Sequence, residues 1–444
     1  MSLKRNLQNI FVRTITSDRT RDRRRSLARL RGKISGKARC VEYFHQVDDP
    51  YSHLACQVLG EFLRRYTVEL KIHLVDAPSD NAAADRDRLI PYARMDAAAI
   101  APALGLSFTD LGEQPSPENH RRASEILAAN LAPGGFSEIA PRVGAALWAD
   151  DSDEILNLAN EFATASEEEM LADRKAGTRR RQKLGHYNGA TFYFEGEWYW
   201  GVDRLHYLEE RLRDEGLRSE SDAGPIIPPR EISGESIEAP DASIVLEYFP
   251  SLRSPYSAIS TERTYALAQQ LPVKLVLKPV LPMVMRGLPV PLSKQLYIMR
   301  DTKREATRQG LPFGDIFDPV GEPVERAFSL YPFAKSQGRA AEYLASFMTN
   351  SFARGVDTGT NEGLRQVVIE AGLSWEEALP HLSHPGWEKE LEANREEMLA
   401  AGIWGVPSYR IRSEGEPDFA IWGQDRLWLV EEEIRRRLQR PRSD

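Results

Sequence analysis

The chain has 444 residues, of which 41% are hydrophobic and 28% are charged, as in globular proteins. At roughly 150 residues per domain, this length corresponds to about three domains. No apolar run reaches the ~18 residues of a conventional membrane span. Two cysteines, Cys40 and Cys56, exclude a disulfide-stapled scaffold and a multi-cysteine zinc site. We therefore expect a protein of a reducing compartment, located in the cytoplasm.

Positive charge is concentrated at the N-terminus. Residues 1–39 contain 13 Lys/Arg and 2 Asp, a net charge of +11, so the rest of the chain carries −8 − 11 = −19. Such an acidic body should repel nucleic acid, and we expect no specific nucleic-acid partner. The basic arm lacks the apolar segment of a secretory signal. It fits a poorly ordered solvated extension, a transit peptide, contact with an anionic surface, or docking on the acidic body.

The sequence contains an internal repeat. Residues 41–55, VEYFHQVDDPYSHLA, align without a gap with residues 246–260, LEYFPSLRSPYSAIS, and 6 of the 15 positions are identical. Two further matches follow in the same order: EEMLA at 168–172 and 396–400, and WGVDRL at 200–205 with WGQDRL at 422–427. Three ordered matches predict two homologous domains.

Both halves predict the same order of elements. Each begins with a short apolar strand, a turn containing Pro-Tyr-Ser, a helix and a second strand, an opening typical of parallel strands. A long helical stretch, a hairpin and a last helix follow. The first half predicts strands at 41–44 and 68–75, a helix at 52–65, a hairpin at 191–194 and 198–200, and a helix at 203–213. The second predicts strands at 244–249 and 273–278, a helix at 257–270, a hairpin at 408–412 and 419–422, and a helix at 425–438. This is the order of a thioredoxin fold with an inserted helical region.

The segment between the halves is rich in Pro, Gly, Ser and Glu and has no helical or strand period, which indicates a linker. The predicted organisation is an arm at 1–39, a first domain at 40–218, a linker at 219–243, a second domain at 244–438 and a tail at 439–444.

The turn after the first strand lies at a helix N-terminus, where free N–H groups and the helix dipole favour a negative charge. A thiolate is the expected occupant, because this position lowers the pKa of a thiol. Redox proteins of this fold have C-x-x-C there, whereas this chain has serines or an aspartate: Asp49-Pro-Tyr-Ser52 and Ser254-Pro-Tyr-Ser257. The turn is therefore predicted to stabilise only a thiolate that another molecule supplies.

A second candidate element is GIWGVPSY, residues 402–409. Pro407 follows Gly-Val and precedes a strand, which suits a cis peptide bond. A cis bond would turn the N–H and C=O of Val406 toward an extended peptide ligand. The alternative is an ordinary proline that begins a strand.

Three segments of the second half carry a family resemblance: LEYFPSLRSPYS, PLSKQLYIMRDTKREATRQGLPF, and GIWGVPSY followed by IWGQDRL. In nearly all of residues 244–438 the chain resembles 2-hydroxychromene-2-carboxylate isomerases and kappa-class glutathione transferases, of the DsbA-like thioredoxin superfamily. Residues 40–214 carry a weaker version. The resemblance implies an α/β chain with two tandem DsbA-like thioredoxin domains, each with an inserted α-helical subdomain.

The resemblance also implies a glutathione site in the second half. Ser254 matches the serine that hydrogen-bonds the glutathione sulfur, and Val406 with Pro407 matches the clamp on the cysteinyl unit. Gln424 and Asp425 match the residues that hold the γ-glutamyl end, where an aspartate gives the ammonium its counter-charge. Asp425 also suits the N-cap of the last helix.

Substrate contacts are less defined. Lys294 fits a basic residue that neutralises a substrate carboxylate, or a solvated surface lysine. Tyr256 and Tyr297 are candidate substrate-binding residues. An apolar pocket or ordinary core packing would explain Met283, Met285, Phe313 and Phe317. The stretch 285–289, MRGLP, lacks the asparagine that this family commonly has there.

The first half departs further. Asp49 replaces the serine, and Ala190 stands opposite Pro407 when GHYNGATF (185–192) is aligned with GIWGVPSY. A carboxylate would repel a thiolate, and a cis bond without proline costs about 2.5–4 kcal/mol. We expect this half to have lost glutathione chemistry and to pair with the second half within the chain. No histidine spacing resembles a metal site, so no metal is expected.

The sequence thus favours a glutathione-dependent isomerase or transferase that acts on a small apolar or aromatic electrophile. A non-catalytic binding or scaffold protein with relic sites is the alternative. A thiol-disulfide oxidoreductase would require Cys40 or Cys56 to cycle between redox states.

Overall fold

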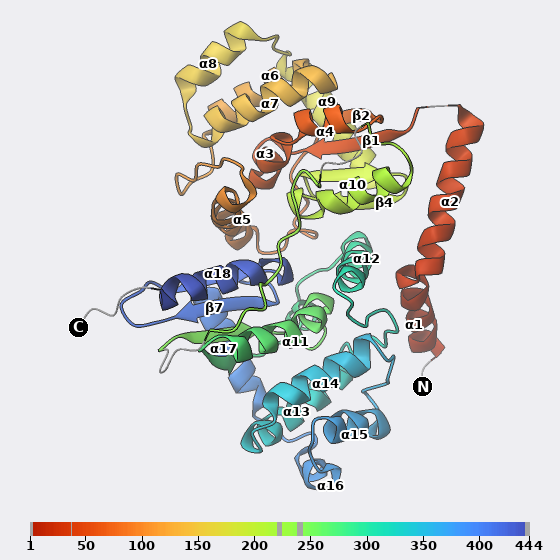
Figure 1. Cartoon of the computed structure of the whole chain (residues 1–444), viewed down its shortest axis with the longest axis vertical. Helices are drawn as coiled ribbons and strands as arrows, with labels where there is room; N and C mark the ends of the chain where they lie inside the picture. The colour runs from red at the N-terminus through yellow and green to blue at the C-terminus, as the bar shows by residue number, and fades with distance from the viewer. Residues whose placement is uncertain (1–2, 37, 220–223, 238–242, 440–444) are drawn as a thin grey trace. The chain divides into compact units, whose positions relative to one another are not determined.

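The computed structural model describes residues 3–36, 38–219, 224–237 and 243–439. The chain divides into two compact units, one formed by residues 22–229 and the other by residues 1–21 with 230–444 (Figure 1). We call them the first unit and the second unit. In the part of the chain that is described, none of the helices combines the length and apolar character needed to cross a membrane.

A four-stranded sheet forms the centre of the first unit, with the strand order β2-β1-β3-β4. The central strand β1 pairs in parallel with β2 and antiparallel with β3, and β3 continues into a hairpin with β4. The bounds are β1 (Cys40–His45), β2 (Glu69–Leu74), β3 (Thr191–Phe194) and β4 (Glu197–Trp200). Five of the six β1 residues are buried, because helices cover both faces of this central strand.

The helices of the first unit follow the predicted order. They are α3 (Pro50–Cys56), α4 (Leu59–Arg65), α5 (Arg86–Ile100), the 3-10 turn η1 (Pro102–Leu104), α6 (Pro117–Ala129), α7 (Pro133–Trp148), α8 (Ser152–Glu161), α9 (Glu167–Lys183), the 3-10 turn η2 (Val202–Arg204) and α10 (Leu205–Asp214). The single helix predicted at 52–65 is wrong. It is interrupted at Gln57 and Val58, where the Gln57 side chain is bonded to the main chain of Ser107 at 2.8 and 3.0 Å.

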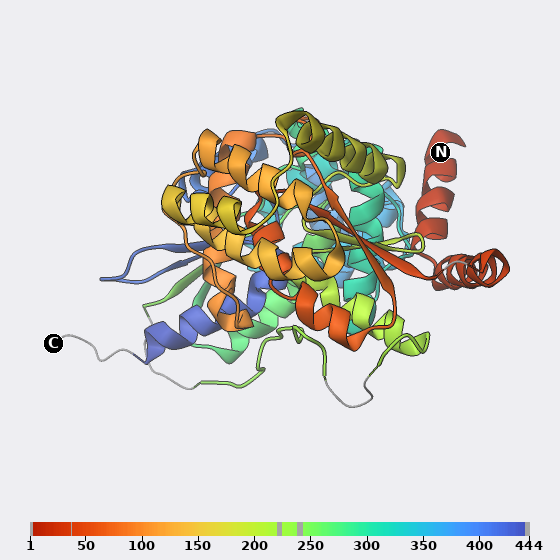
Figure 2. The same cartoon turned by 90° about the horizontal axis from the view of Figure 1, so that it is seen from above.

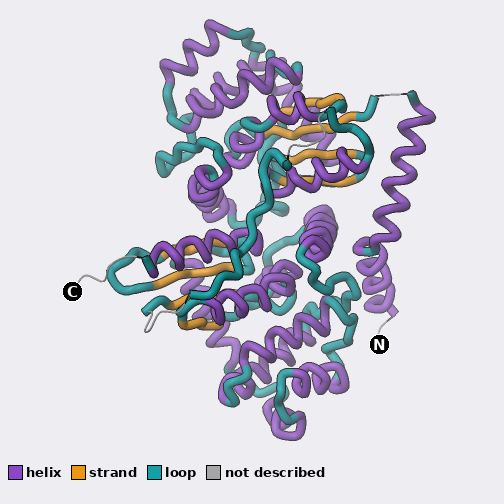
Figure 3. Tube along the Cα trace, viewed as in Figure 1, coloured by secondary structure: helices purple, strands orange, loops and turns teal. Residues whose placement is uncertain are grey.

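The second unit repeats this arrangement. Its sheet, whose strands are orange in Figure 3, has the order β6-β5-β7-β8, with β5 parallel to β6 and antiparallel to β7. The bounds are β5 (Val245–Phe249), β6 (Lys274–Leu277), β7 (Ser408–Arg412) and β8 (Phe419–Trp422). The parallel opening and the antiparallel hairpin were both predicted, and the pairing confirms them.

A helical core lies between β6 and β7 in sequence. The helices of this unit are α11 (Pro255–Gln270), η3 (Met283–Arg286), α12 (Leu292–Arg308), α13 (Glu322–Ser336), α14 (Ala340–Phe352), α15 (Asn361–Glu370), α16 (Trp375–Ala378), η4 (Leu379–His381), α17 (Trp387–Ala400), η5 (Gln424–Arg426) and α18 (Leu427–Leu438). Aromatic side chains of α13 and α14, including Phe328, Tyr343 and Phe347, are fully buried in one cluster with Ile259 of α11. This cluster fastens the helices to the side of α11.

Equivalent elements of the two units occur in the same order, and their separation in sequence increases along the chain. The first proline of α3 and that of α11 differ by 255 − 50 = 205, the ends of α9 and α17 by 400 − 183 = 217, and the starts of α10 and α18 by 427 − 205 = 222. The EEMLA match does not follow this register, because 168–172 begins α9 whereas 396–400 ends α17. That match is therefore not evidence of equivalence: Glu, Met, Leu and Ala are all common helix formers, so such strings recur by chance.

The N-terminal arm is helical, with α1 (Leu3–Thr16) and α2 (Asp18–Ser35), both red in Figure 2. In the second unit, Val12 of α1 is buried in the helical core. Arg13 pairs with Asp315 at 2.6 Å, and the Thr16 hydroxyl donates to the Gly314 carbonyl at 3.1 Å. In the first unit, Arg25 of α2 donates two hydrogen bonds to Glu197 at 2.7 and 2.8 Å.

Candidate functional site

Ser254 begins α11 in the second unit. Its hydroxyl accepts a hydrogen bond from the Ser257 N–H at 3.1 Å, and Pro255 occupies the first helical position. Serine before proline is a strong start signal, because the hydroxyl satisfies an unpaired N–H and proline has none to satisfy. With one N–H already bound to its oxygen, the half-buried Ser254 hydroxyl keeps its own hydrogen to donate.

Val406 lies across from Ser254, on the loop before β7. The Ser254 hydroxyl donates to the Val406 carbonyl at 3.4 Å, and the Val406–Pro407 peptide bond is cis, as predicted. The loop is held on both sides of this bond. The Ser408 hydroxyl donates to the Gly405 carbonyl at 2.7 Å, and the Gly423 N–H donates to the Pro407 carbonyl at 3.0 Å. The fold thus brings together two residues that are 152 positions apart in sequence.

Gln424 and Asp425 lie in η5, directly before α18. The Gln424 side chain is buried, donates to Glu305 at 2.7 Å and accepts from Arg263 at 3.1 Å. The Asp425 carboxylate is 28% exposed, with Arg426 at 3.8 Å. Asp425 is not the N-cap of the last helix, because Arg426 holds that position. The Asp425 side chain is thus partly accessible. It lies two residues after Gly423, whose N–H binds the Pro407 carbonyl.

Tyr256 and Tyr297 meet at a buried carboxylate that the sequence analysis missed. The Tyr256 hydroxyl donates to Asp301 at 2.8 Å, and the Tyr297 hydroxyl lies 3.5 Å from the other oxygen of the same carboxylate. Asp301 is 1% exposed. This trio ties the first turn of α11 to α12.

The first unit contains the same trio at positions exactly 205 residues earlier. There Tyr51 donates to Asp96 at 2.8 Å, and Tyr92 lies 3.5 Å from the other carboxylate oxygen. The signal was present in the sequence, since both tyrosines and the aspartate recur at the spacing of the repeat. A trio shared by both units favours a structural role over substrate binding.

Lys294 lies near the start of α12 and is half-buried. Burial lowers the pKa of its ammonium group to about 8. Among the residues predicted to line an apolar pocket, Phe313 belongs to the buried helical core and Met285 packs against it. For these two side chains the structure favours the core-packing alternative.

Asp49 holds the place of Ser254 in the first unit. Its carboxylate accepts from the Ser52 N–H at 2.9 Å and from the Ser52 hydroxyl at 2.7 Å. Burial raises the pKa of Asp49 to about 6, against the opposing effect of these hydrogen bonds. The group is thus partly protonated near neutral pH.

Ala190 stands where the second unit has Pro407. Its N–H donates to the Ser52 hydroxyl at 2.8 Å, and its φ of +53° lies in the left-handed region. The preceding Gly189 is closely packed, because a Cβ there would lie 2.6 Å from Gln46 and 3.1 Å from Asp49. The main chain of this loop therefore occupies the space beside Asp49 and is hydrogen-bonded to the Ser52 hydroxyl.

The two cysteines lie in the first unit, on β1 and α3. Burial raises the pKa of Cys40 to about 11 and that of Cys56 still further. Neither is in the turn that carries Asp49 or the one that carries Ser254. No group of three His, Cys, Asp or Glu side chains within the described ranges is arranged to hold a metal ion.

Comparison with known proteins finds a family match in the second unit. Residues 245–435 match the family model of the DSBA-like thioredoxin domain. The second unit contains a DsbA-like thioredoxin domain. No match was found among curated protein sequences.

Three solved structures each align with less than half of this chain. A 2-hydroxychromene-2-carboxylate isomerase is 19% identical over 44% of this chain and 96% of its own, with a TM-score of 0.37. A probable DsbA oxidoreductase from Streptomyces coelicolor is 18% identical over 45% and 93%, with a TM-score of 0.36. The cytosolic disulfide reductase DsbM from Pseudomonas aeruginosa, solved with GSH, is 17% identical over 44% and 99%, with a TM-score of 0.33.

Proposed function

We propose that the second unit binds glutathione and uses its thiolate as the nucleophile of an isomerase or transferase reaction on a small apolar or aromatic electrophile. The observation that carries this proposal is the position of the Ser254 hydroxyl. It stands at the N-terminus of a 16-residue helix, 3.4 Å from the Val406 carbonyl, in a turn without cysteine. A site built to stabilise a thiolate, but with no thiol of its own, requires a thiol-bearing ligand.

The residues of the site fit such a ligand. In the complex the Ser254 hydroxyl turns its hydrogen from the Val406 carbonyl to the sulfur, while the Ser257 N–H orients the hydroxyl oxygen. The dipole of α11 adds to this and lowers the pKa of a thiol at its N-terminus. Both effects favour the thiolate over the thiol at neutral pH.

The peptide part of glutathione is assigned to the loop and to η5. We place its cysteinyl unit along the main chain of Val406 and its γ-glutamyl ammonium at the Asp425 carboxylate. Gln424 contributes through its main chain, because its side chain is bonded to Glu305 and Arg263. Bound glutathione supplies the nucleophilic thiolate. In an isomerase the thiolate leaves again after the substrate bond has rotated, whereas in a transferase the carbon–sulfur bond stays in the product.

Lys294 is assigned to a substrate carboxylate. With a pKa of about 8, its ammonium group is mostly charged at pH 7 and mostly neutral at pH 9. A carboxylate substrate should then bind less well above pH 8. The proposed reaction requires reduced glutathione, which is consistent with a cytoplasmic location.

We also propose that the two halves arose by tandem duplication and that the first has lost glutathione chemistry. The shared order of elements, the equal strand orders and the two Tyr-Tyr-Asp trios support the duplication. The packing of Gly189 and Ala190 against Asp49 and Ser52 supports the loss. A scaffold role for the whole chain is the second candidate, and this closed arrangement in the first unit is the observation in its favour.

Calorimetric titration with reduced glutathione tests the proposal. Wild type should bind one glutathione per chain, and Asp425→Ala should bind it at least ~10-fold more weakly, since a charge-assisted hydrogen bond is worth about 1.5–3 kcal/mol. The matched control is Asp203→Ala, the equivalent position in the first unit, which should bind as wild type does. Absence of binding at millimolar glutathione would remove the enzyme proposal and leave the scaffold role. Equal losses in the two variants would remove the γ-glutamyl assignment.

A further inference from the structure

The outer face of α2 carries an apolar stripe. Leu27, Leu30 and Ile34 are 52%, 54% and 77% exposed. Their spacing of three and four residues places them on one side of the helix. Large apolar side chains that share one exposed face mark a surface that another body covers.

The opposite face of α2 is attached to the first unit. Arg25 forms its two hydrogen bonds with Glu197, and Arg29 lies 3.9 Å from Glu215. Each of these arginines is two residues from Leu27, which places them roughly on the other side of the helix. The attachment therefore directs the apolar stripe away from the unit rather than into its core.

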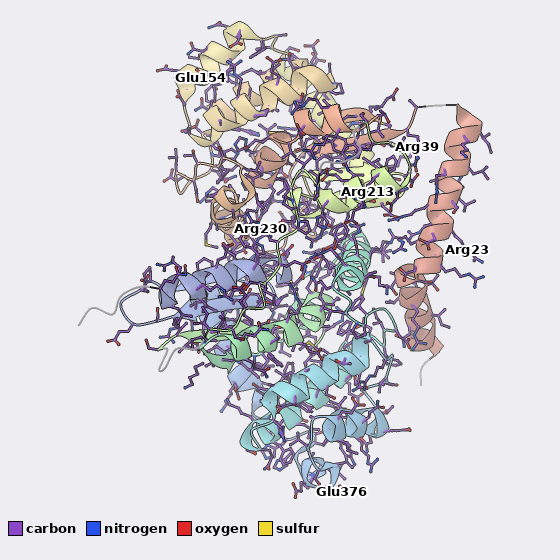
Figure 4. All side chains as sticks on the ribbon, viewed as in Figure 1. Arg23, Arg39, Glu154, Arg213, Arg230 and Glu376 are labelled. Atoms are coloured by element: carbon purple, nitrogen blue, oxygen red, sulfur yellow. The ribbon has the colours of Figure 1, made fainter. Side chains whose placement is uncertain are left out.

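Arginines flank the stripe. Arg23 lies one turn before Leu27 and Arg31 one turn after it, and both are exposed. Neither makes a salt bridge in the described ranges, whereas the arginines on the opposite face do. The Arg23 side chain is labelled on α2 in Figure 4. Apolar residues between arginines that make no salt bridge in the described ranges form the kind of surface that an amphipathic helix presents to a membrane interface.

We propose that this face of α2 docks on an anionic lipid membrane surface. Charge complementarity selects the partner, since residues 1–39 carry a net charge of +11 and the stripe itself contains no acidic residue. Anionic headgroups would pair with Arg23 and Arg31 while the three apolar side chains enter the boundary between headgroups and acyl chains. The proposal is independent of the glutathione site.

Other occupants fit the face less well. A nucleic acid would pair with the arginines but would leave Leu27, Leu30 and Ile34 in water. A second copy of the chain would cover the leucines, but it would bring the same arginines face to face.

Vesicle flotation with the full-length protein tests the proposal. The probes are vesicles of phosphatidylcholine alone and vesicles in which a third of the lipid is phosphatidylglycerol. Wild type should float with the anionic vesicles, release them at high salt, and remain in solution with the neutral ones. Arg23→Gln with Arg31→Gln should bind about 30-fold more weakly, at roughly a factor of five per basic residue at the surface.

The apolar residues need a matched control. The triple variant Leu27→Gln, Leu30→Gln and Ile34→Gln should bind at least ~10-fold more weakly. The control replaces three exposed leucines elsewhere in the first unit: Leu111, Leu156 and Leu171, at 58%, 42% and 43% exposure, all to Gln. It should bind as wild type does. Circular dichroism of both triple variants shows whether α2 stays helical.

Three outcomes would overturn the proposal. The first is no flotation with anionic vesicles. The second is equal loss in the two triple variants, which would indicate non-specific adsorption. The third is that the arginine and leucine variants float with anionic vesicles as wild type does. Their effects would then appear only in duplex DNA binding or in self-association on gel filtration.

Discussion

The turn that follows the first strand differs between the two four-stranded sheets. In the second unit, the Ser254 hydroxyl faces the Val406 carbonyl at 3.4 Å and is half-buried. In the first, Ser52 and Asp49 are bonded to each other, and the Ala190 N–H closes on Ser52 at 2.8 Å. Proline has no N–H, so the second unit cannot make this closing bond. Two replacements, Asp49 for Ser254 and Ala190 for Pro407, thus accompany the additional internal hydrogen bonds of the first unit.

The largest expected effect comes from Ser254→Ala. Loss of a hydroxyl that stabilises a developing or ground-state thiolate should lower kcat/KM by about 100- to 1,000-fold. The measurement is the rate with glutathione and an aromatic electrophile, together with the ultraviolet pH titration of the bound thiol, whose pKa should rise. Asp49→Ser, which gives the first unit the serine found in the second, should leave the rate unchanged. An unaltered thiol pKa in Ser254→Ala would show that Ser254 does not act on the sulfur.

Ala190→Pro tests whether the closing bond stabilises the first unit. Proline removes the N–H that binds Ser52 and cannot adopt a φ of +53°, so unfolding should become easier by about 3 kcal/mol or more. No gain in glutathione binding is expected, because Asp49 remains. Urea denaturation provides the measurement. Ala190→Gly keeps the N–H and accepts the positive φ, and it should be about 1 kcal/mol more stable than wild type. A stable proline variant that binds a second glutathione would mean that this residue alone closed the site.

Asp49 should make the stability of the first unit depend on pH. Its pKa is about 6 in the folded state against about 3.9 unfolded, so the folded state binds more protons between these values. Stability from this group is present below pH 4 and falls as the pH rises to 6, by about 3 kcal/mol in total. Asp49→Asn removes the titration and should be more stable than wild type at pH 7 but equal to it at pH 4. Denaturation at the two pH values checks this, and an equal difference at both would exclude Asp49 as the cause.

The smallest effect is expected where the units agree. Tyr256→Phe and Tyr51→Phe each remove one hydrogen bond to a buried aspartate, and each should cost about 1.5–3 kcal/mol of stability. If Tyr256 only ties α11 to α12, its variant should keep the wild-type KM. A raised KM in Tyr256→Phe, with the stability loss shared by both variants, would restore Tyr256 as a substrate-binding residue.

Local patterns were sufficient for much of this protein. Ser254, Pro255 and Pro407 stand next to the backbone features that they determine, and short apolar runs indicated the first strand of each half. Such signals depend on neighbours in sequence, so the β-α-β openings, the hairpins and the cis bond could all be predicted. The EEMLA match failed for the same reason: it reported helix-forming composition and not position.

Contacts between distant residues were decided only by the tertiary structure. The Gln424 side chain is bonded to Glu305, 119 positions away, and Ala190 is bonded to Ser52, 138 positions away. Each depends on how the sheet brings loops together, and a polar side chain takes the partner that burial leaves it. The arm is the clearest case. Its charge was evident from the sequence, but only the packing of α2 determined which arginines are paired and which side of the helix remains exposed.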